Sequence, residues 1–511
     1  MSFKLERDRS AVAGHTKRQE TRQGTAQTVA ASVMLLAAAL ALGACSDLSR
    51  FQLTTTSPPS QTARPARTPI QQTAAAEREH ERILASYGGV YEDARLSGLI
   101  SKAVDKLVAA SERPDLSYKV TILNSPAINA FALPTGQLYI TRGLIALASD
   151  TSELSSVLSH EMAHVIARHA AIREDQARQA AIVSRVVTDI GADPELSALA
   201  LARSKLTLAS FSRAQEFEAD GIGVGIAARA GFDPFGAVRF LTSMERNAAL
   251  KAPRNGNDPR SLDFLSSHPA TPERAQNAQA NARQFTSPGA GDRDREGYLD
   301  ALDEMIYGED PSEGFVRSRR FIHPKLGFTF TAPEGFSLDN TAQAVIGVRD
   351  GGTQAMRFDV ARVSSEQSLG DYLTSGWIDD VDKTTVEDVT VNGFPAATAI
   401  ARGEQWRFRI YALRFGSDVY RFVFASKQKG GEGDRSFRET VNTFRRLTLA
   451  EIQGARPLRL KIITVQPGDT VESLSHRMAG VDRQIERFRI LNGLDAKSTI
   501  KARDRVKIVA E

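Results

Sequence analysis

The sequence predicts an α+β fold in three parts: a mainly helical domain with a small sheet, an α+β sandwich-like domain, and a small βααβ tail. Apolar residues recur at helical spacing through most of 76–306, the period changes to two between 320 and 450, and the tail has the order strand, helix, helix, strand. The chain of 511 residues also exceeds the roughly 150 residues of an ordinary domain. We therefore expect domains at 76–306, 315–450 and 457–511.

Residues 1–44 predict a signal peptide rather than part of the fold. Three basic residues between positions 17 and 22 precede 29–42, an uncharged apolar run of 14 residues that is too short to span a bilayer. The run leads into the segment LGAC at 42–45, which resembles the bacterial lipoprotein box. This resemblance implies lipidation of Cys45 and a membrane anchor, and Ser46 as the next residue favours the periplasmic face of the outer membrane. The alternative is a plain secretory signal with an incidental cysteine.

Residues 45–75 predict a flexible, lipid-anchored linker, because they are rich in Ser, Thr, Pro and Gln and offer little to bury.

The charge balance argues against a nucleic-acid partner. The formal net charge is +4, and residues 1–44 hold six basic and three acidic residues, so about +1 remains without them. Nucleic-acid binding needs a concentrated basic surface that displaces counterions.

The first domain is predicted from helical periodicity and from helix-start signals. Helices are expected over 92–112, 151–170, 212–230 and 271–283, and strands over 118–124 and 137–141. The helix over 151–170 has Asp150 as its N-cap and Glu153 three residues later, as in a capping box.

His160-Glu161-Met162-Ala163-His164 lies inside that helix. Two histidines four residues apart project from one helix face, and both can bind a single zinc ion. Glu161 would lie beside the metal, where it can take a proton from water. The alternative is a pair of ordinary polar residues on a half-buried helix. We expect one Zn²⁺ per chain.

A third ligand is expected from residues 211–220, which offer three carboxylates: Glu216, Glu218 and Asp220. Positions 216 and 220 share a helix face and 218 points elsewhere, but spacing alone does not choose among the three.

The segments HEMAHVIARH and SRAQEFEADGIG resemble those of the gluzincin peptidase family that includes HtpX, BepA and the CAAX prenyl protease. The resemblance implies a mainly helical zincin peptidase domain. It also implies that Glu216 is the third zinc ligand and that Asp220 supports a ligand histidine, which leaves Glu218 as a solvated or structural carboxylate.

Two further segments match this family. Ser267-His268-Pro269, followed by Arg274, resembles its His-Pro motif, which implies that His268 stabilises the oxyanion during catalysis. The alternative for His268 is a histidine at the entry of the helix over 271–283. Residues 129–136 resemble the family's substrate-side edge strand. His169 lies five residues beyond His164, off the ligand face, and is assigned a structural role.

The second domain is predicted from alternating residues, as in Trp406, Phe408 and Ile410, from a hairpin turn at Asn392-Gly393, and from helices near 368–375 and 435–446. It shows no catalytic constellation. The tail over 457–511 resembles a LysM module, which implies peptidoglycan as a further partner. Arg503-Asp504 replaces the glycine usual before its closing strand.

Together these features predict a zinc metalloendopeptidase of the bacterial cell envelope that hydrolyses misfolded or unassembled envelope proteins. Two alternatives stay open: a chaperone or cell-wall-binding lipoprotein with a latent zinc site, and a peptidoglycan peptide hydrolase. The Gly/Asn/Pro-rich segment 250–263, just before His268, is a candidate plug over the metal.

Overall fold

The computed structural model describes residues 69–176, 211–251, 264, 268, 272–349, 352–403, 406–427 and 433–511. The expectations for the signal peptide, for Cys45 and for nearly all of the segment 250–263 lie outside the described residues. Within these ranges, none of the helices combines the length and the apolar character needed to cross a bilayer.

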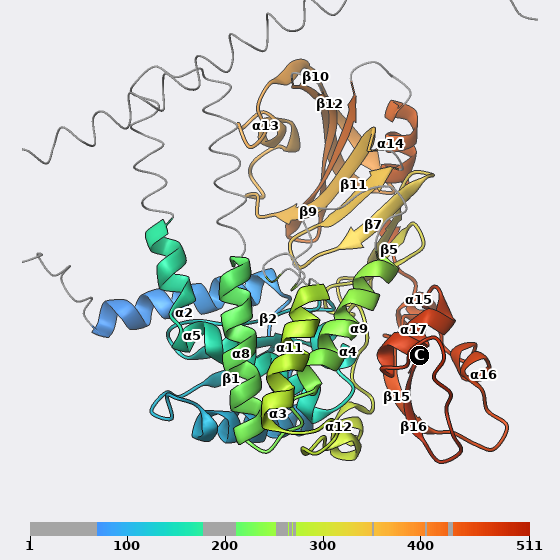
Figure 1. Ribbon diagram of the computed structural model, residues 1–511. Helices are drawn as coiled ribbons and strands as arrows, with labels where there is room; N and C mark the ends of the chain where they lie inside the picture. Colours follow the sequence, from blue (N-terminus) through green and yellow to red (C-terminus); the bar gives the residue numbers. More distant parts are fainter. Residues whose placement is uncertain are drawn as a thin grey trace, which may run out of the picture. The chain divides into compact units, whose positions relative to one another are not determined.

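The first domain is a helical region with a small sheet, as predicted (Figure 1). Its helices are α2 (Pro69–Ser86), α3 (Ala94–Ala110), α4 (Arg142–Leu147), α5 (Thr151–Ile166), α8 (Arg213–Arg229), α9 (Gly236–Lys251), α11 (Pro272–Phe285) and α12 (Arg295–Leu302). The sheet order is β1-β3-β2: β3 (Gln137–Thr141) pairs parallel with β1 (Lys119–Leu123) and antiparallel with β2 (Ala130–Ala132). The short strand β2 therefore lies at a sheet edge.

Helix α5 is the centre of this domain, and its residues 151–164 are all buried. Helices α8 and α9 pack against it, and α11 packs against α8 and α9 (Figure 1). The contact with α8 is close because Gly223 has no side chain: a Cβ there would lie 2.9 Å from the backbone nitrogen of His160. An alanine at this position would push α8 away from α5.

The N-terminus of α5 differs in one bond from the expected capping box. Asp150 is the N-cap, and its Oδ1 accepts from the backbone N–H of Glu153 at 2.9 Å, as predicted. The carboxylate of Glu153, however, accepts from the backbone N–H of Ser149 and from Arg239 instead of returning to Asp150. The helix also ends at Ile166, four residues before the expected boundary at 170.

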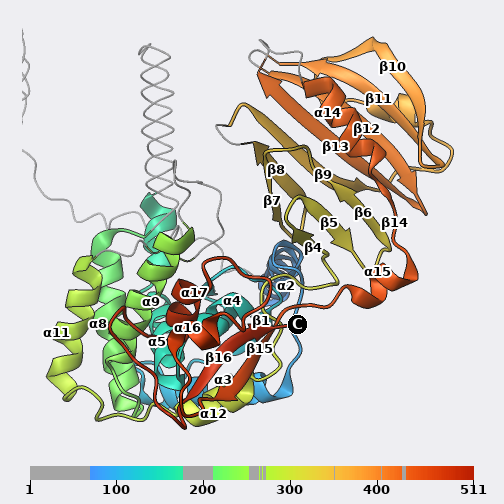
Figure 2. The ribbon, with the colours of Figure 1, turned by 90° about the vertical axis from the view of Figure 1, so that its right-hand side faces the viewer.

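The second domain is a large antiparallel region, which confirms the predicted change to period two. Seven strands follow the order β10-β11-β12-β13-β9-β8-β7, and a four-stranded sheet follows the order β14-β6-β5-β4 (Figure 2). Their bounds are β4 (Phe315–Arg317), β5 (Arg320–His323), β6 (Phe328–Thr331), β7 (Phe336–Asn340), β8 (Val345–Arg349), β9 (Gln354–Ala361), β10 (Val381–Val391), β11 (Phe394–Arg402), β12 (Trp406–Phe415), β13 (Asp418–Lys427) and β14 (Arg445–Arg446).

The turn and the helices predicted in the second domain are also present. Asn392 and Gly393 both have positive φ, at 47° and 85°, and join β10 to β11 in the two-residue turn that their sequence predicts. Helices α13 (Leu369–Leu373) and α14 (Gly433–Asn442) lie near the expected ranges.

The tail consists of β15 (Arg459–Thr464), α16 (Val471–Ser475), α17 (Gln484–Leu491) and β16 (Arg505–Ala510), preceded by α15 (Leu449–Gly454). The order strand, helix, helix, strand is as predicted, and the two strands pair antiparallel. Its likeness to LysM stays a prediction.

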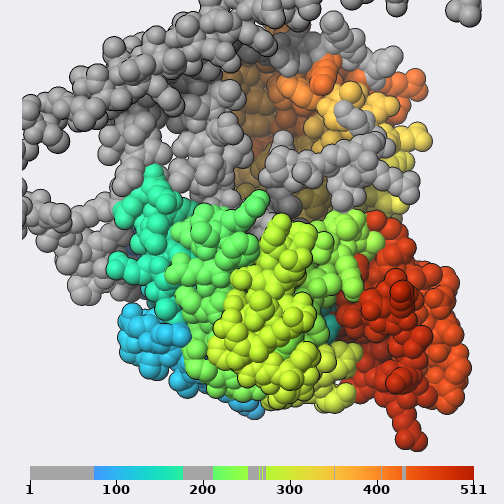
Figure 3. Space-filling view, viewed as in Figure 1, coloured from blue at the N-terminus to red at the C-terminus, as the bar shows by residue number. Residues whose placement is uncertain are grey.

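The tail shares its core with the helical domain. Leu460, Phe488 and Val509 belong to the same buried cluster as Leu158 of α5. The fully buried Lys507 donates to Ala146 O at 2.8 Å and Ala148 O at 2.7 Å, just before the zinc-motif helix begins. Figure 3 shows the red tail in direct contact with the yellow-green residues near position 300, where Arg505 pairs with Asp300.

Deleting residues 457–511 is expected to unfold the helical domain rather than free it. Each large apolar side chain that leaves this core removes about 1.5–3 kcal/mol of burial, and the deletion removes several of them. Thermal unfolding of the full chain and of the truncated chain measures the difference. An unchanged unfolding temperature for the helical domain would instead mean that the tail is an independent, tethered module.

Candidate metal centre

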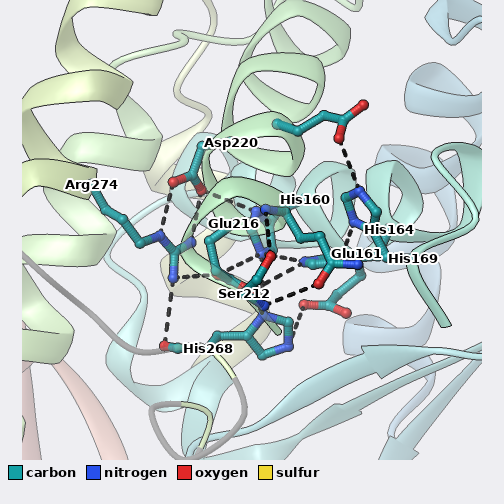
Figure 4. Close-up of polar contacts among 11 residues, drawn as sticks. His160, Glu161, His164, His169, Ser212, Glu216, Asp220, His268 and Arg274 are labelled. Carbon is teal, nitrogen blue, oxygen red and sulfur yellow. Dashed lines mark hydrogen bonds and ion pairs between the residues drawn. The ribbon is translucent and has the colours of Figure 1, made fainter. Parts of the chain in front are cut away.

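Four buried side chains converge at one point of the helical domain (Figure 4). His160 and His164 come from α5, Glu216 comes from α8, and His268 lies just before α11. One ligand atom from each lies within 4.8 Å of the others. Among the described residues, this cluster is the one group of His, Cys, Asp and Glu whose ligand atoms converge in this way.

The separations between these atoms match those around a small tetrahedral ion. Nε2 of His160 lies 3.0 Å from Nε2 of His164 and 3.6 Å from Oε2 of Glu216, and Nε2 of His164 lies 3.5 Å from Oε1 of Glu216. Ligands about 2.0–2.1 Å from zinc in a tetrahedron lie about 3.3 Å apart. Each of the two histidines therefore lies near this spacing from one carboxylate oxygen of Glu216, His160 from Oε2 and His164 from Oε1.

The start of α8 places Glu216. Ser212 is the N-cap and forms a capping box with Gln215, so the helix begins in a defined register. Glu216 and Asp220 then lie one turn apart on the buried face, while the side chain of Glu218 is 59% exposed. The structure thus brings Glu216, and not Glu218, to the two histidines.

A second layer of contacts holds the ligands. Nδ1 of His160 lies 3.0 Å from Oδ1 of Asp220. Arg274 is 2% exposed and bonds both carboxylates, at 2.7 Å to Asp220 and 2.6 Å to Glu216. A carboxylate on the far nitrogen of a ligand histidine orients its ring and strengthens it as a donor.

The model of Peptidase family M48 matches residues 94–282, which contain the whole cluster. Residues 94–282 are therefore similar to the peptidases of family M48, and their buried His-His-Glu-His cluster is a zinc site of the metallopeptidase kind.

Curated relatives agree over the same region. The mitochondrial metalloendopeptidase OMA1 of Schizosaccharomyces pombe is 30% identical over 39% of this chain and 57% of its own. The putative beta-barrel assembly-enhancing protease of Vibrio cholerae is 32% identical over 40% and 43%, and the beta-barrel assembly-enhancing protease of Escherichia coli is 29% identical over 40% and 42%. The chain therefore spans about half the length of these relatives.

Burial sets the protonation of the M48 cluster. It lowers the pKa of His160, and it lowers that of His164 together with the charge of its neighbour His160. Burial and Arg274 also lower the pKa of His268 to about 3. Burial alone would raise the pKa of Asp220, but hydrogen bonds from Arg274 and His160 bring it down to about 2. Neutral histidines beside an ionised Asp220 are the state that a metal ligand needs.

Glu161 lies beside the cluster but is not part of it. Burial raises its pKa well above the ordinary value, and the charge of Glu216 adds to this effect. Its Oε1 is buried and has no hydrogen-bond partner among the described residues. A buried acceptor without a partner needs an explanation, and a water molecule next to the metal would supply the missing donor. The residues present therefore fit a zinc ion with a reacting water.

Other contacts of the M48 site do not follow from the motif spacing. The ring of Phe211 lies 4.0 Å from that of His164, and the ring of Phe264 stacks at 4.2 Å on that of His268. Both phenylalanines lie a few residues before a site residue. His169, which we expected off the ligand face, contacts His164 directly.

Proposed function

We propose that the chain is a zinc metalloendopeptidase of the bacterial cell envelope that cleaves misfolded or unassembled envelope proteins. The observation that carries this proposal is the buried convergence of His160, His164 and Glu216. Beside them lies Oε1 of Glu161, which has no hydrogen-bond partner among the described residues. In the proposal, these three residues hold zinc, and Asp220 and Arg274 hold the ligands in place.

The chemistry is hydrolysis of a peptide bond in one attack by water. A zinc ion held by His160, His164 and Glu216 would supply Lewis acidity, which would polarise the carbonyl and make water a nucleophile at neutral pH. Glu161 takes the proton of the attacking water at Oε1 and then gives it to the leaving amine nitrogen. Glu161 is buried beside the cluster, where its carboxyl group can hold the proton between the two transfers.

His268 is proposed to donate to the oxygen that becomes negative during the attack. Its ring lies at the same centre, with Nδ1 2.9 Å from Oε1 of Glu216 and Nε2 3.7 Å from Oε1 of Glu161. The structure also allows a competing role, because His268 is close enough to act as a fourth ligand.

Replacing His268 by alanine separates the two roles. An oxyanion donor predicts a loss of about 10²–10³-fold in kcat, with zinc affinity largely kept by the other three ligands. His476→Ala, on the exposed surface of the tail, is the matched control. A gain in activity would show that His268 occupies the metal and blocks the site.

The substrate class rests on the edge strand and on the relatives. Strand β2 lies at the sheet edge, and the backbone N–H of its Ala132 donates to the carboxylate of Glu161. An extended peptide paired along this edge would place its backbone beside the proposed base, with weak dependence on side chains. The names of two relatives refer to beta-barrel assembly, and Cys45 supplies the proposed lipid anchor.

The test compares one substrate in two states. An outer-membrane β-barrel protein is offered to the purified enzyme either unfolded in dilute buffer or folded in detergent micelles. We expect cleavage of the unfolded form alone, and its loss in the presence of a chelator. The absence of chelator-sensitive products would favour a binding protein with a latent site, and release of cross-link fragments from purified cell walls would favour a peptidoglycan hydrolase.

A further inference from the structure

His169 is the one fully buried histidine of the site that the proposed chemistry does not use. Its Nδ1 lies 2.9 Å from Nδ1 of His164, and its Nε2 lies 3.2 Å from Oε2 of Glu218 (Figure 4). The three side chains thus form a chain of contacts from the proposed zinc ligand outward to a carboxylate whose side chain is 59% exposed.

A break in the helix brings His169 to this place. In a continuous helix, position 169 would be rotated about 140° from position 164. Helix α5 instead ends at Ile166, and Arg168 takes the left-handed conformation with φ of 58°. Such a conformation is unusual for arginine and marks a constrained turn. The turn redirects the chain, so the ring of His169 meets the ring of His164 edge to face, with centroids 4.9 Å apart.

The contacts determine which nitrogen carries each proton. His164 has its Nε2 at the metal centre, so a neutral ring has its proton on Nδ1 and donates it to His169. Nδ1 of His169 must then be the acceptor, which leaves its proton on Nε2, where it donates to Glu218. Once His164 has its proton on Nδ1, a proton on Nδ1 of His169 would set two donors against each other at 2.9 Å.

We propose that His169 and Glu218 are positioning residues for zinc binding: His169 fixes the ring of His164 with its acceptor nitrogen, and Glu218 fixes the tautomer of His169. This inference rests on the proposed role of His164 as a zinc ligand. It gives His164 the kind of partner that Asp220 gives His160, so each ligand histidine is held at its far nitrogen. It also replaces the structural role that spacing suggested for His169 and the solvated or structural role that the family resemblance left for Glu218.

The expected effects are graded along the chain of contacts. His169→Ala removes the acceptor and is expected to weaken zinc binding by about 10–100-fold. His169→Asn places an amide oxygen near the lost Nδ1 and is expected to restore most of the affinity. Glu218→Ala acts at an exposed site and is expected to reduce zinc affinity less than His169→Ala does. Glu218→Gln keeps an acceptor and is expected to reduce zinc affinity least.

Competition between the protein and a chromogenic chelator measures the zinc dissociation constants. Glu486→Ala, which removes an exposed glutamate on α17, is the matched control for Glu218→Ala. The unfolding temperature of each variant is measured with and without zinc. If His169 has a positioning role, zinc raises the unfolding temperature of His169→Ala less than that of the wild type, while the zinc-free proteins unfold at similar temperatures.

Two results would overturn the inference: wild-type zinc affinity in His169→Ala, or affinity lost equally in His169→Ala and His169→Asn. His164→Ala distinguishes this failure from a failure of the proposed function. If His164→Ala also binds zinc as the wild type does, the ligand assignment itself is wrong. If His169→Ala binds zinc as the wild type does but His164→Ala does not, the ligand assignment is retained and the positioning role of His169 is wrong.

Discussion

Replacing Glu161 by glutamine is expected to abolish peptide hydrolysis while leaving the zinc site loaded. Glutamine has nearly the same shape but cannot accept the proton of the attacking water, and loss of a general base costs about 10²–10⁴-fold in rate. Glu161 is not among the four converging ligand atoms, so zinc content should stay at one per chain. Cleavage of an unfolded, fluorescently labelled polypeptide measures the rate, and metal analysis of the same sample measures zinc.

The control for this variant is Glu486→Gln, which makes the same chemical change at an exposed position of α17. It should cleave at the wild-type rate. If Glu161→Gln also retained full activity, the assignment of Glu161 as the base would be wrong.

Replacing Arg274 by methionine is expected to destabilise the zinc-free protein by about 3–5 kcal/mol, the usual cost of removing one partner from a buried ion pair. Arg274 is the cation that bonds both Asp220 and Glu216 inside the domain. Without it, two carboxylates stay buried side by side. Zinc should recover part of the loss, because Glu216 then gains a cation as its partner.

Urea unfolding of the zinc-free proteins measures this effect. Arg283→Met is the matched control, since Arg283 lies on the same helix with an exposed side chain. Equal stability of the two variants would contradict the structural role given to Arg274.

The helices and strands that carry the site were predictable because their signals are local. Asp150 and Ser212 precede their helices as N-caps, and Asn392-Gly393 encodes a turn by conformational preference. The two zinc histidines were likewise readable, because four residues of helix place them one turn apart. The choice of Glu216 over Glu218 needed the family resemblance, and the structure brings Glu216 to the histidines.

The contacts that sequence did not reveal depend on a broken helix or on distant parts of the chain. The role of His169 depends on the left-handed turn at Arg168, and the sequence does not signal this turn because the left-handed residue is not a glycine. Lys507 donates to Ala146 O in α4, a residue about 360 positions earlier in the chain. The close approach of α8 to α5 at Gly223 is also a property of the packed pair, because the glycine is informative only once His160 is opposite it.

In the proposed function, one zinc ion held by His160, His164 and Glu216 is required for peptide-bond cleavage. The most direct measurement strips the metal from the purified protein, confirms the loss by metal analysis, and follows cleavage of an unfolded polypeptide as zinc is returned. We expect no cleavage without metal and full recovery at one equivalent of zinc per chain. Undiminished cleavage by the metal-free protein would contradict it.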